Sequence, residues 1–283
     1  MPALNTTTTT TPTITIGGDL PAFRLGFGAM RLTGPPAWLD RLAATRIARR
    51  AVELGVNFID TADSYDLGEN EELLAAALYP YPPGVVVATK GGQVNLGDDW
   101  IPLGRPEYLR QQAELSLRRL RLDWIDLYQL HRIDPAVPLA DQIGALRILQ
   151  DQGKIRHVGL SEVTTGQLAE AQQITPIVSV QNRYNLTDRA AEDILQYCER
   201  HSIAFIPWYP VAPIARGKAA DGLAEVSRRL GATRTQVALA WLLRHSSVMV
   251  PIPGTSSRAH LDENVAAAAL PLSASDYAQL TQT

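Results

Sequence analysis

Residues 55 to 65 read Gly-Val-Asn-Phe-Ile-Asp-Thr-Ala-Asp-Ser-Tyr. A helix is expected to end at Leu54-Gly55, and Phe58-Ile59 form a short apolar run typical of a buried parallel strand. Asp60 then lies where this strand ends, and Tyr65 follows in the next loop. We therefore expect Asp60 and Tyr65 to share a site with groups from neighbouring strands.

Two further apolar runs end on a titratable side chain. The run Val85–Thr89 is followed by Lys90, and the run Ile125–Leu130 is followed by His131. Packing alone does not require a titratable residue at the end of three strands. The pattern therefore indicates a functional edge of the sheet.

Strand and helix patterns alternate along the chain from Leu25 onward, without a composition break or a linker. Eight such units predict a parallel sheet closed into a (β/α)8 TIM barrel. The strands are expected at Leu25–Gly28, Asn57–Asp60, Val85–Thr89, Ile125–Leu130, His157–Leu160, Ile177–Gln181, Ile203–Pro207 and Val248–Pro251. Helical spacing of apolar residues predicts helices near Ala43–Leu54, Leu73–Leu78, Leu109–Leu120, Leu139–Leu149, Thr165–Gln173, Ala190–His201, Gly222–Leu230, Thr235–Arg244 and Ser257–Ala268.

A short β-hairpin is expected before the barrel, from Thr13–Ile16, a turn at Gly17-Gly18-Asp19, and Ala22-Phe23. Residues 1–12 are Thr-rich and predicted to be a disordered tail, so residues 13–283 form the single catalytic domain. A doubly wound open sheet is the structural competitor. It would need a glycine fingerprint after the first strand, and the segment 26–30 lacks the third glycine.

Composition excludes several classes of function. Hydrophobic residues make up 46% of the chain, which is enough for a large core. A net charge of −3 and a pI of about 6.0 give no electrostatic case for binding nucleic acid or an anionic membrane. There is no apolar run of about 20 residues and no secretory signal pattern. Cys198 is the only cysteine, so no disulfide or thiolate metal cluster is expected. We expect a soluble cytoplasmic protein without a metal, and a monomer by default.

In a barrel, the carboxyl ends of the strands face one side, where Asp60, Tyr65, Lys90 and His131 would converge. Taken singly, each has an ordinary interpretation: a helix cap, a loop aromatic, a surface cation and an imidazole bonded to backbone. Those interpretations do not explain the convergence. A glycosidase carboxylate pair of Asp60 and Glu69 is another alternative, but it leaves the tyrosine and the lysine without a role.

The four side chains suit proton donation to a developing alkoxide. A free phenol has a pKa of about 10, too high for an efficient acid near neutrality. A nearby Lys90 ammonium is expected to lower the pKa of Tyr65, and Asp60 would keep that ammonium charged. His131 could donate a hydrogen bond to a substrate carbonyl. The reaction needs an external reductant, because no side chain here carries a hydride.

Four segments resemble signatures of the aldo-keto reductase superfamily, and the match covers nearly the whole chain after the tail. They are Gly55–Tyr65, Ile125–His131, Gly153–Ser161, and Ile252–Thr255 together with Glu263-Asn264. The bacterial branch with a short C-terminus is the most similar. The resemblance implies carbonyl reduction with Tyr65 as general acid and Asp60, Lys90 and His131 as its partners. It implies NADPH as cofactor, with NADH less favoured.

The resemblance also assigns cofactor positions. Ser161 and Gln181 would bind the nicotinamide carboxamide, and Trp208 would stack on its ring unless it only covers the barrel end. The start of the last helix would bind the adenosine phosphate. Arg258 and His260 would add positive charge there. The full set is Gly28, Met30, Asp60, Ser161, Gln181, Trp208, Gly254, Thr255, Ser256, Arg258, His260, Glu263 and Asn264.

The sequence departs from the family pattern at three positions. Asp66 follows Tyr65 where the family usually has glycine. Glu162 follows Ser161 where asparagine is common. Gly254 stands where many members place a lysine against the 2′-phosphate, so the choice of NADPH rests on the resemblance.

The substrate end is expected to be open and shallow. The chain ends at Thr283, soon after the last expected helix, which leaves no long C-terminal loop to cover the site. Its walls would come from segments 91–104 and 209–220. Trp100, Trp208 and Tyr209 would line it, which favours aromatic or planar aldehydes and ketones; the branch that the chain resembles includes enzymes acting on pyridoxal. Two rivals remain: a nucleotide-sensing binding module, and a biosynthetic alcohol dehydrogenase running in the oxidative direction.

Overall fold

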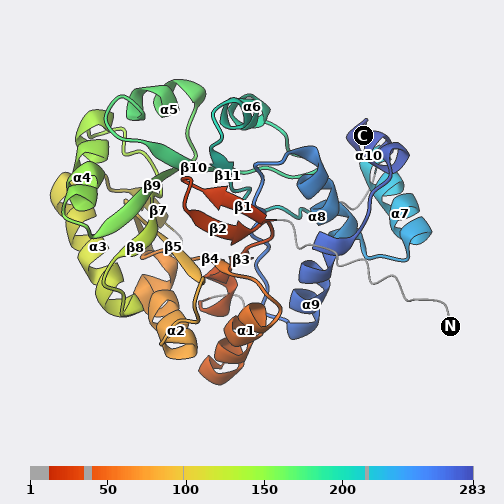
Figure 1. The fold of residues 1–283 in the computed structure, drawn as a ribbon, viewed down its shortest axis with the longest axis horizontal. Helices are drawn as coiled ribbons and strands as arrows, with labels where there is room; N and C mark the ends of the chain where they lie inside the picture. Colours follow the sequence, from red (N-terminus) through yellow and green to blue (C-terminus); the bar gives the residue numbers. More distant parts are fainter. Residues whose placement is uncertain (1–12, 35–39, 98, 214–216, 283) are drawn as a thin grey trace.

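The computed structural model describes residues 13–34, 40–97, 99–213 and 217–282, and the predicted tail at 1–12 lies outside them. Figure 1 shows a curled central sheet surrounded by helices. Its strands are parallel and neighbour one another in chain order. They are β3 (Phe27–Gly28), β4 (Phe58–Asp60), β5 (Val86–Gly91), β8 (Ile125–Leu130), β9 (Ile155–Ser161), β10 (Ile177–Gln181) and β11 (Ala204–Phe205).

The segment 248–253 lies between the first and last of these strands. Phe205 exchanges backbone hydrogen bonds with Val248 and Val250, at 2.9 and 2.8 Å, and the Gly26 N–H donates to the Pro251 carbonyl at 2.9 Å. The strand predicted at Val248–Pro251 is not regular, because Pro251 and Pro253 have no N–H to donate to a ladder. Its carbonyls still join the two edges of the sheet. The arrangement is consistent with the predicted (β/α)8 barrel.

Helices cover the outer face of the sheet, and their starts follow from the sequence. Asp40 caps the first, while Thr164 with Gln167 and Thr233 with Gln236 form capping boxes. The helices are α1 (Arg41–Glu53), α2 (Glu69–Leu78), α3 (Pro106–Leu120), α4 (Leu139–Asp151), α5 (Thr165–Ala171), α6 (Glu192–Arg200), α7 (Lys218–Leu230), α8 (Arg234–His245), α9 (Arg258–Ala266) and α10 (Ala274–Thr281). Short 3-10 turns occur at η1 (Ala29–Leu32), η2 (Tyr65–Gly68) and η3 (Ala267–Ala269).

Two apolar cores separate the layers. The larger one lies between the sheet and the helices, and the smaller one fills the inside of the sheet. β1 (Thr13–Ile16) and β2 (Leu20–Phe23) form an antiparallel pair that lies across the centre of the ring in Figure 1. Their residues Ile16, Leu20 and Ala22 are buried in the inner core with Phe58 and Leu127. The β1–β2 pair therefore plugs the inside of the sheet from one end.

Two elements differ from expectation. The wall segment 91–104 contains a β-hairpin of β6 (Gln93–Leu96) and β7 (Asp99–Pro102), whose mixed polarity gave little strand signal. The chain also forms a further helix, α10, where no helix was expected. Its N-cap is Ser273, and its apolar contact with α7 and α8 could not be read from a short polar stretch. This helix lies against the outer layer and does not cover the cavity described below.

Within the described ranges, no helix is both long and apolar enough to cross a bilayer.

Candidate active site

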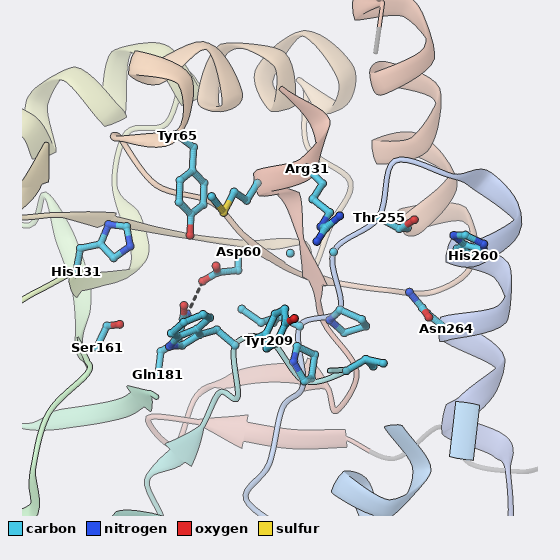
Figure 2. A pocket seen from close by; sticks show the side chains of 18 of the residues that line it. Arg31, Asp60, Tyr65, His131, Ser161, Gln181, Tyr209, Thr255, His260 and Asn264 are labelled. Atoms are coloured by element: carbon cyan, nitrogen blue, oxygen red, sulfur yellow. Dashed lines mark hydrogen bonds between the residues drawn. The ribbon is translucent and has the colours of Figure 1, made fainter. Parts of the chain in front are cut away.

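A cavity of about 620 Å³ opens at the carboxyl ends of the strands. Figure 2 shows it as an elongated space, with Tyr65, His131, Ser161 and Gln181 at one end. Thr255, His260 and Asn264 lie at the other end, and Arg31 and Tyr209 lie between the two. We call the first the reaction end and the second the α9 end.

The predicted site residues divide into two groups. Those that line the cavity are Gly28, Met30, Asp60, Tyr65, Trp100, His131, Ser161, Gln181, Trp208, Tyr209, Gly254, Thr255, His260, Glu263 and Asn264. Lys90 is fully buried behind Asp60 and Tyr65, and Ser256 and Arg258 do not line the cavity. Sequence reasoning did not name Arg31, Arg132, Thr235, Ile252 and Pro253 as site residues, and it placed Gln93, Pro210 and Val211 only within the expected wall segments 91–104 and 209–220.

Lys90 joins the acid to the carboxylate at the reaction end. Its Nζ donates to Asp60 Oδ1 at 2.5 Å, to the Thr61 carbonyl at 2.8 Å and to Tyr65 Oη at 3.2 Å. These three acceptors use all three protons of an ammonium group. The geometry therefore fixes the tyrosine hydroxyl next to a buried positive charge.

The pKa values of this group reflect opposing effects. Burial lowers the pKa of Lys90, but the attraction of Asp60 and Tyr65 outweighs it, so the net shift is upward and the ammonium stays charged. Burial raises the pKa of Tyr65 by more than Lys90 lowers it. The expectation of a lowered phenol pKa is therefore wrong in this structure, because desolvation of the phenolate exceeds the stabilisation by Lys90.

The second oxygen of Asp60 accepts hydrogen bonds from two amides. Gln129 Nε2 donates at 3.1 Å and Gln181 Nε2 at 2.8 Å. Gln129 was missed, although a glutamine within the apolar run 125–130 is itself a signal of a polar partner inside the barrel. The predicted cofactor residue Gln181 therefore also orients the Asp60 carboxylate.

His131 lies beside the tyrosine with its ring edge-on, 5.8 Å between ring centroids. Its Nδ1 contacts Ser64 Oγ at 3.3 Å. Burial lowers the pKa of His131 well below its usual value, and the charges of Lys90 and Arg132 lower it further. The imidazole is therefore neutral at physiological pH. Trp100 on the β6–β7 hairpin covers both rings, at 6.3 Å from Tyr65 and 6.4 Å from His131.

The loop after Tyr65 has an unusual backbone. Asp66 and Leu67 have φ values of 50° and 54°, in the left-handed region that favours glycine. Asp66 therefore takes the conformation that the more common glycine would adopt at its position. Gly68 at φ 94° lies against the Arg119 guanidinium, where an added Cβ would be 2.4 Å from Cζ. Arg119 in turn pairs with the buried Glu71, which holds the tyrosine loop on α2 and α3.

Glu162, the second departure from the family pattern, has its own role. It adopts φ 55°, and its Oε1 accepts hydrogen bonds from the Trp208 Nε1 at 2.6 Å and the Arg183 backbone N–H at 2.7 Å. Glu162 therefore fixes the Trp208 ring at the cavity wall. The neighbouring Ser161 Oγ accepts a hydrogen bond from Arg132 at 3.0 Å.

Two glycine backbones touch in the middle of the cavity. An added Cβ at Gly28 would lie 2.7 Å from the Ile252 carbonyl oxygen, and one at Gly254 would lie 2.9 Å from the Gly28 carbonyl oxygen. Side chains at either position would force these segments apart. Arg31 projects into the same region in Figure 2. The cavity wall here, which we call the glycine floor, consists of the Gly28 and Gly254 backbones without side chains, and the Arg31 cation lies next to it. The diphosphate of a dinucleotide could bind there.

The α9 end offers unused hydrogen-bonding groups. Ser257 caps α9 through the His260 N–H at 3.4 Å, which leaves other first-turn amides available. Asn264 is 5% exposed, and its Oδ1 has no hydrogen-bond partner among the described residues. A buried acceptor without a partner costs free energy unless a ligand supplies the donor. The amino group of an adenine would be such a donor, so the cavity fits a dinucleotide along its full length.

Other candidate groups lie elsewhere. Glu69 pairs with Arg41 on the surface at 2.8 Å and does not face Asp60, which removes the glycosidase pair. Cys198 is buried in the outer core. Within the part of the chain that the structure describes, no three His, Cys, Asp or Glu side chains gather at a metal-binding distance.

Comparison with known proteins gives a consistent result. The aldo/keto reductase family model matches residues 24–283. An uncharacterized oxidoreductase of Schizosaccharomyces pombe is 50% identical over 269 residues, covering 94% of this chain and 88% of its own. The pyridoxine 4-dehydrogenase of Escherichia coli is 41% identical over 261 residues, covering 88% and 91%.

Solved structures agree with this relationship. An aldo/keto reductase from Klebsiella pneumoniae, in complex with NADP and acetate, superposes with a TM-score of 0.81 at 27% identity, covering 96% of this chain and 94% of that one. The matches extend over both the barrel and the segments that build the cavity. The chain therefore belongs to the aldo/keto reductase family and is an NAD(P)H-dependent oxidoreductase.

Proposed function

We propose that this chain is an NADPH-dependent carbonyl reductase that converts aldehydes and ketones to alcohols, with Tyr65 as the general acid. The observation that carries the proposal is the position of Lys90, whose Nζ bonds both Asp60 Oδ1 and Tyr65 Oη at the edge of the cavity. A phenol held there can give its proton to an alkoxide oxygen without entering bulk water. Burial raises the pKa of Tyr65, so the phenol is protonated in the free protein, and the Lys90 charge offsets part of that rise and so favours release of the proton to the alkoxide.

The bound NADPH supplies the hydride. Tyr65 Oη transfers its proton to the carbonyl oxygen as negative charge develops there, and Lys90 stabilises the resulting phenolate. Asp60 compensates the Lys90 charge when no phenolate is present. We assign Ser64 Oγ as the donor to His131 Nδ1, which places the proton of the neutral imidazole on Nε2, where it would bond the substrate oxygen.

The residues proposed to hold the cofactor follow the length of the cavity. Ser161 and Gln181 would bind the carboxamide, and Trp208, fixed by Glu162, would pack on the nicotinamide. Arg31 over the Gly28–Gly254 floor would neutralise the diphosphate. Thr255, Ser256, Arg258 and His260 would bind the adenosine 2′-phosphate, with Glu263 and Asn264 at the adenine. NADP in the Klebsiella pneumoniae relative supports this choice of cofactor.

The substrate proposed is an aromatic or otherwise planar carbonyl compound. Trp100 and Tyr209 are each 37% exposed and flank the reaction end with Trp208. Flat rings at an open mouth favour flat ligands by stacking. Activity confined to long aliphatic aldehydes, with none on aromatic ones, would contradict this part of the proposal.

Tyr65→Phe tests the mechanism. Removing one hydroxyl should lower carbonyl reduction by roughly 10²- to 10⁴-fold, the usual contribution of a positioned acid. NADPH binding, followed by quenching of tryptophan fluorescence, should be retained. Tyr197→Phe, on the outside of α6, is the matched control. Negligible turnover by the unaltered protein, with intact cofactor binding, would favour a nucleotide-sensing module.

A second candidate function is oxidation of one dedicated alcohol, and the pyridoxine 4-dehydrogenase relative favours testing it. Steady-state kinetics on pyridoxal with NADPH, and on pyridoxine with NADP⁺, would separate the two directions. A higher kcat/KM for oxidation at neutral pH would select the dehydrogenase.

We propose further that the protein is a cytoplasmic monomer. Size-exclusion chromatography with light scattering would test the oligomeric state.

A further inference from the structure

Arg132 brings a cation to the reaction end that the proposed mechanism does not use. It follows His131 directly and lines the cavity. Its Nη1 donates to the His131 carbonyl at 2.6 Å and to Ser161 Oγ at 3.0 Å. These bonds hold the guanidinium in one place. Its Nε and Nη2 have no hydrogen-bond partner within the described ranges.

The negative charges nearby are already occupied. Asp60 is saturated by Lys90, Gln129 and Gln181. One oxygen of the Glu162 carboxylate, Oε1, accepts the Trp208 and Arg183 hydrogen bonds, and Glu162 attracts Arg132 without forming an ion pair with it. No carboxylate of the described residues forms an ion pair with Arg132, in contrast to Lys90. The reaction end therefore presents an immobilised positive charge with unused donors toward the cavity.

This charge acts on the reacting groups. Arg132 contributes to the lowered pKa of His131, after burial and Lys90, and it opposes the upward shift of the Tyr65 pKa. Burial lowers the pKa of Arg132 itself, and the attraction of Glu162 and Tyr65 offsets this loss of hydration only in part. A bound anion would recover that loss.

We propose that Arg132 recognises an anionic oxygen of the substrate, and that the substrate class is a planar carbonyl compound carrying a carboxylate or a phenolate. This inference rests on the proposed reductase function. A guanidinium binds such oxygens through two parallel N–H groups, which fixes orientation as well as position. With the ring against Trp100 and the anion on Arg132, the carbonyl is directed toward Tyr65 and His131. The alternative is that Arg132 only ties the His131 backbone to Ser161.

Matched substrates distinguish the two roles. We would compare 4-carboxybenzaldehyde with methyl 4-formylbenzoate, and pyridoxal with pyridine-4-carbaldehyde, at saturating NADPH. The unaltered protein should prefer the anionic member of at least one pair, and the preferred pair identifies carboxylate or phenolate. In Arg132→Gln, the kcat/KM ratio of anionic to uncharged substrate should fall by about 10- to 100-fold, as expected for a lost charge-assisted hydrogen bond. Arg132→Lys should fall between the two.

Arg31→Gln is the control, because it removes the same charge from the same cavity at a different point. It should weaken NADPH binding and leave the substrate ratio unchanged. If Arg132 only connects the His131 backbone to Ser161, Arg132→Gln should lower kcat/KM by the same factor for the anionic and the uncharged member of each pair. That result, or a preference of the unaltered protein for both uncharged members, would overturn the proposal.

A binding measurement separates this inference from the proposed function. Calorimetry of 4-carboxybenzyl alcohol and benzyl alcohol, each titrated into the NADPH-loaded protein and its Arg132→Gln variant, measures a complex that cannot turn over in either direction. Tighter binding of the carboxylate that is lost in the variant supports the anion site even if no aldehyde is reduced. Equal affinities for both alcohols would contradict the anion site at Arg132, whatever the reductase activity.

Discussion

The two ends of the cavity are built in opposite ways. At the reaction end, Lys90 is 0% and Asp60 1% exposed, and every polar contact of Asp60 is made within the protein. At the α9 end, Arg258 and His260 are exposed, and Asn264 keeps an acceptor without a partner. The chemistry is thus preorganised by mutual compensation, whereas the α9 end leaves groups available for a ligand.

Lys90→Met should cause the largest loss, because it leaves Asp60 buried without a counter-ion. Removing one partner of a buried pair costs about 3–5 kcal/mol of the free energy of unfolding. Urea unfolding would measure this cost, and carbonyl reduction should become undetectable. The double variant Asp60→Asn/Lys90→Met removes both charges and should recover most of the stability while staying inactive. If Lys90→Met alone were as stable as the unaltered protein, the charges of Lys90 and Asp60 would not compensate each other as described.

Asp63→Asn tests whether the Asp63 carboxyl, next to the tyrosine loop, is desolvated in the folded protein. Burial raises the pKa of Asp63 well above 3.8, and the charge of Glu71 raises it further. The folded state therefore keeps a proton that the unfolded state releases, so the Asp63 contribution to stability is present below pH 3.8 and is lost as pH rises toward the folded pKa.

The variant has no proton to lose there. Its stability relative to the unaltered protein should grow by up to about 1.4 kcal/mol per pH unit across this window. Urea unfolding at several pH values between roughly 4.5 and 8 measures the slope. Asp66→Asn makes the same substitution at an exposed position of the same loop and is the matched control. A flat difference for Asp63 would show that its carboxyl is solvated in solution.

Arg31→Ala and Arg258→Ala should distinguish the contacts with the cofactor diphosphate from those with the 2′-phosphate. Arg31 lies over the glycine floor, where both cofactors carry the diphosphate, so its loss should raise the Kd of NADPH and NADH alike by about 10-fold. Arg258 begins α9 and should matter only for the 2′-phosphate, raising the KM for NADPH far more than for NADH. Equal effects of Arg258→Ala on both cofactors would exclude a phosphate role there.

Asn264→Ala should have the smallest effect on the protein itself. Its Oδ1 has no protein partner to lose, so the free energy of unfolding should change by less than about 1 kcal/mol. Cofactor affinity should fall several-fold, equally for NADPH and NADH, because both carry adenine. Fluorescence titration measures the affinity. A stability loss with unchanged affinity would mean that Asn264 is structural.

Much of the reaction end could be predicted from the sequence, because apolar runs mark buried strands and a titratable residue at the end of a run is conspicuous. Asp60, Lys90 and His131 were found in this way. Gln129 and Arg132 were missed, since their roles depend on partners in other strands. The direction of the Tyr65 pKa shift was also wrong, because it depends on a desolvation that no spacing reveals.

The fold shows the same division. Helices with clear periodicity and caps were predicted near their observed bounds. The helix α10 and the β6–β7 hairpin were not, because short mixed segments are stabilised by what they pack against. The left-handed backbone at Asp66 and Leu67 likewise occurs at residues that are not glycine, which the sequence alone does not indicate.

The contact between Gly28 and Gly254 has a consequence for the whole chain. These residues belong to the first and the last segments of the ring, so their meeting point is the seam where the cylinder closes. A dinucleotide bound here would contact both the first and the last segment of the sheet. Binding of the cofactor would then slow hydrogen exchange of backbone amides in both segments, and the slowest-exchanging amides would include those of the first and last strands.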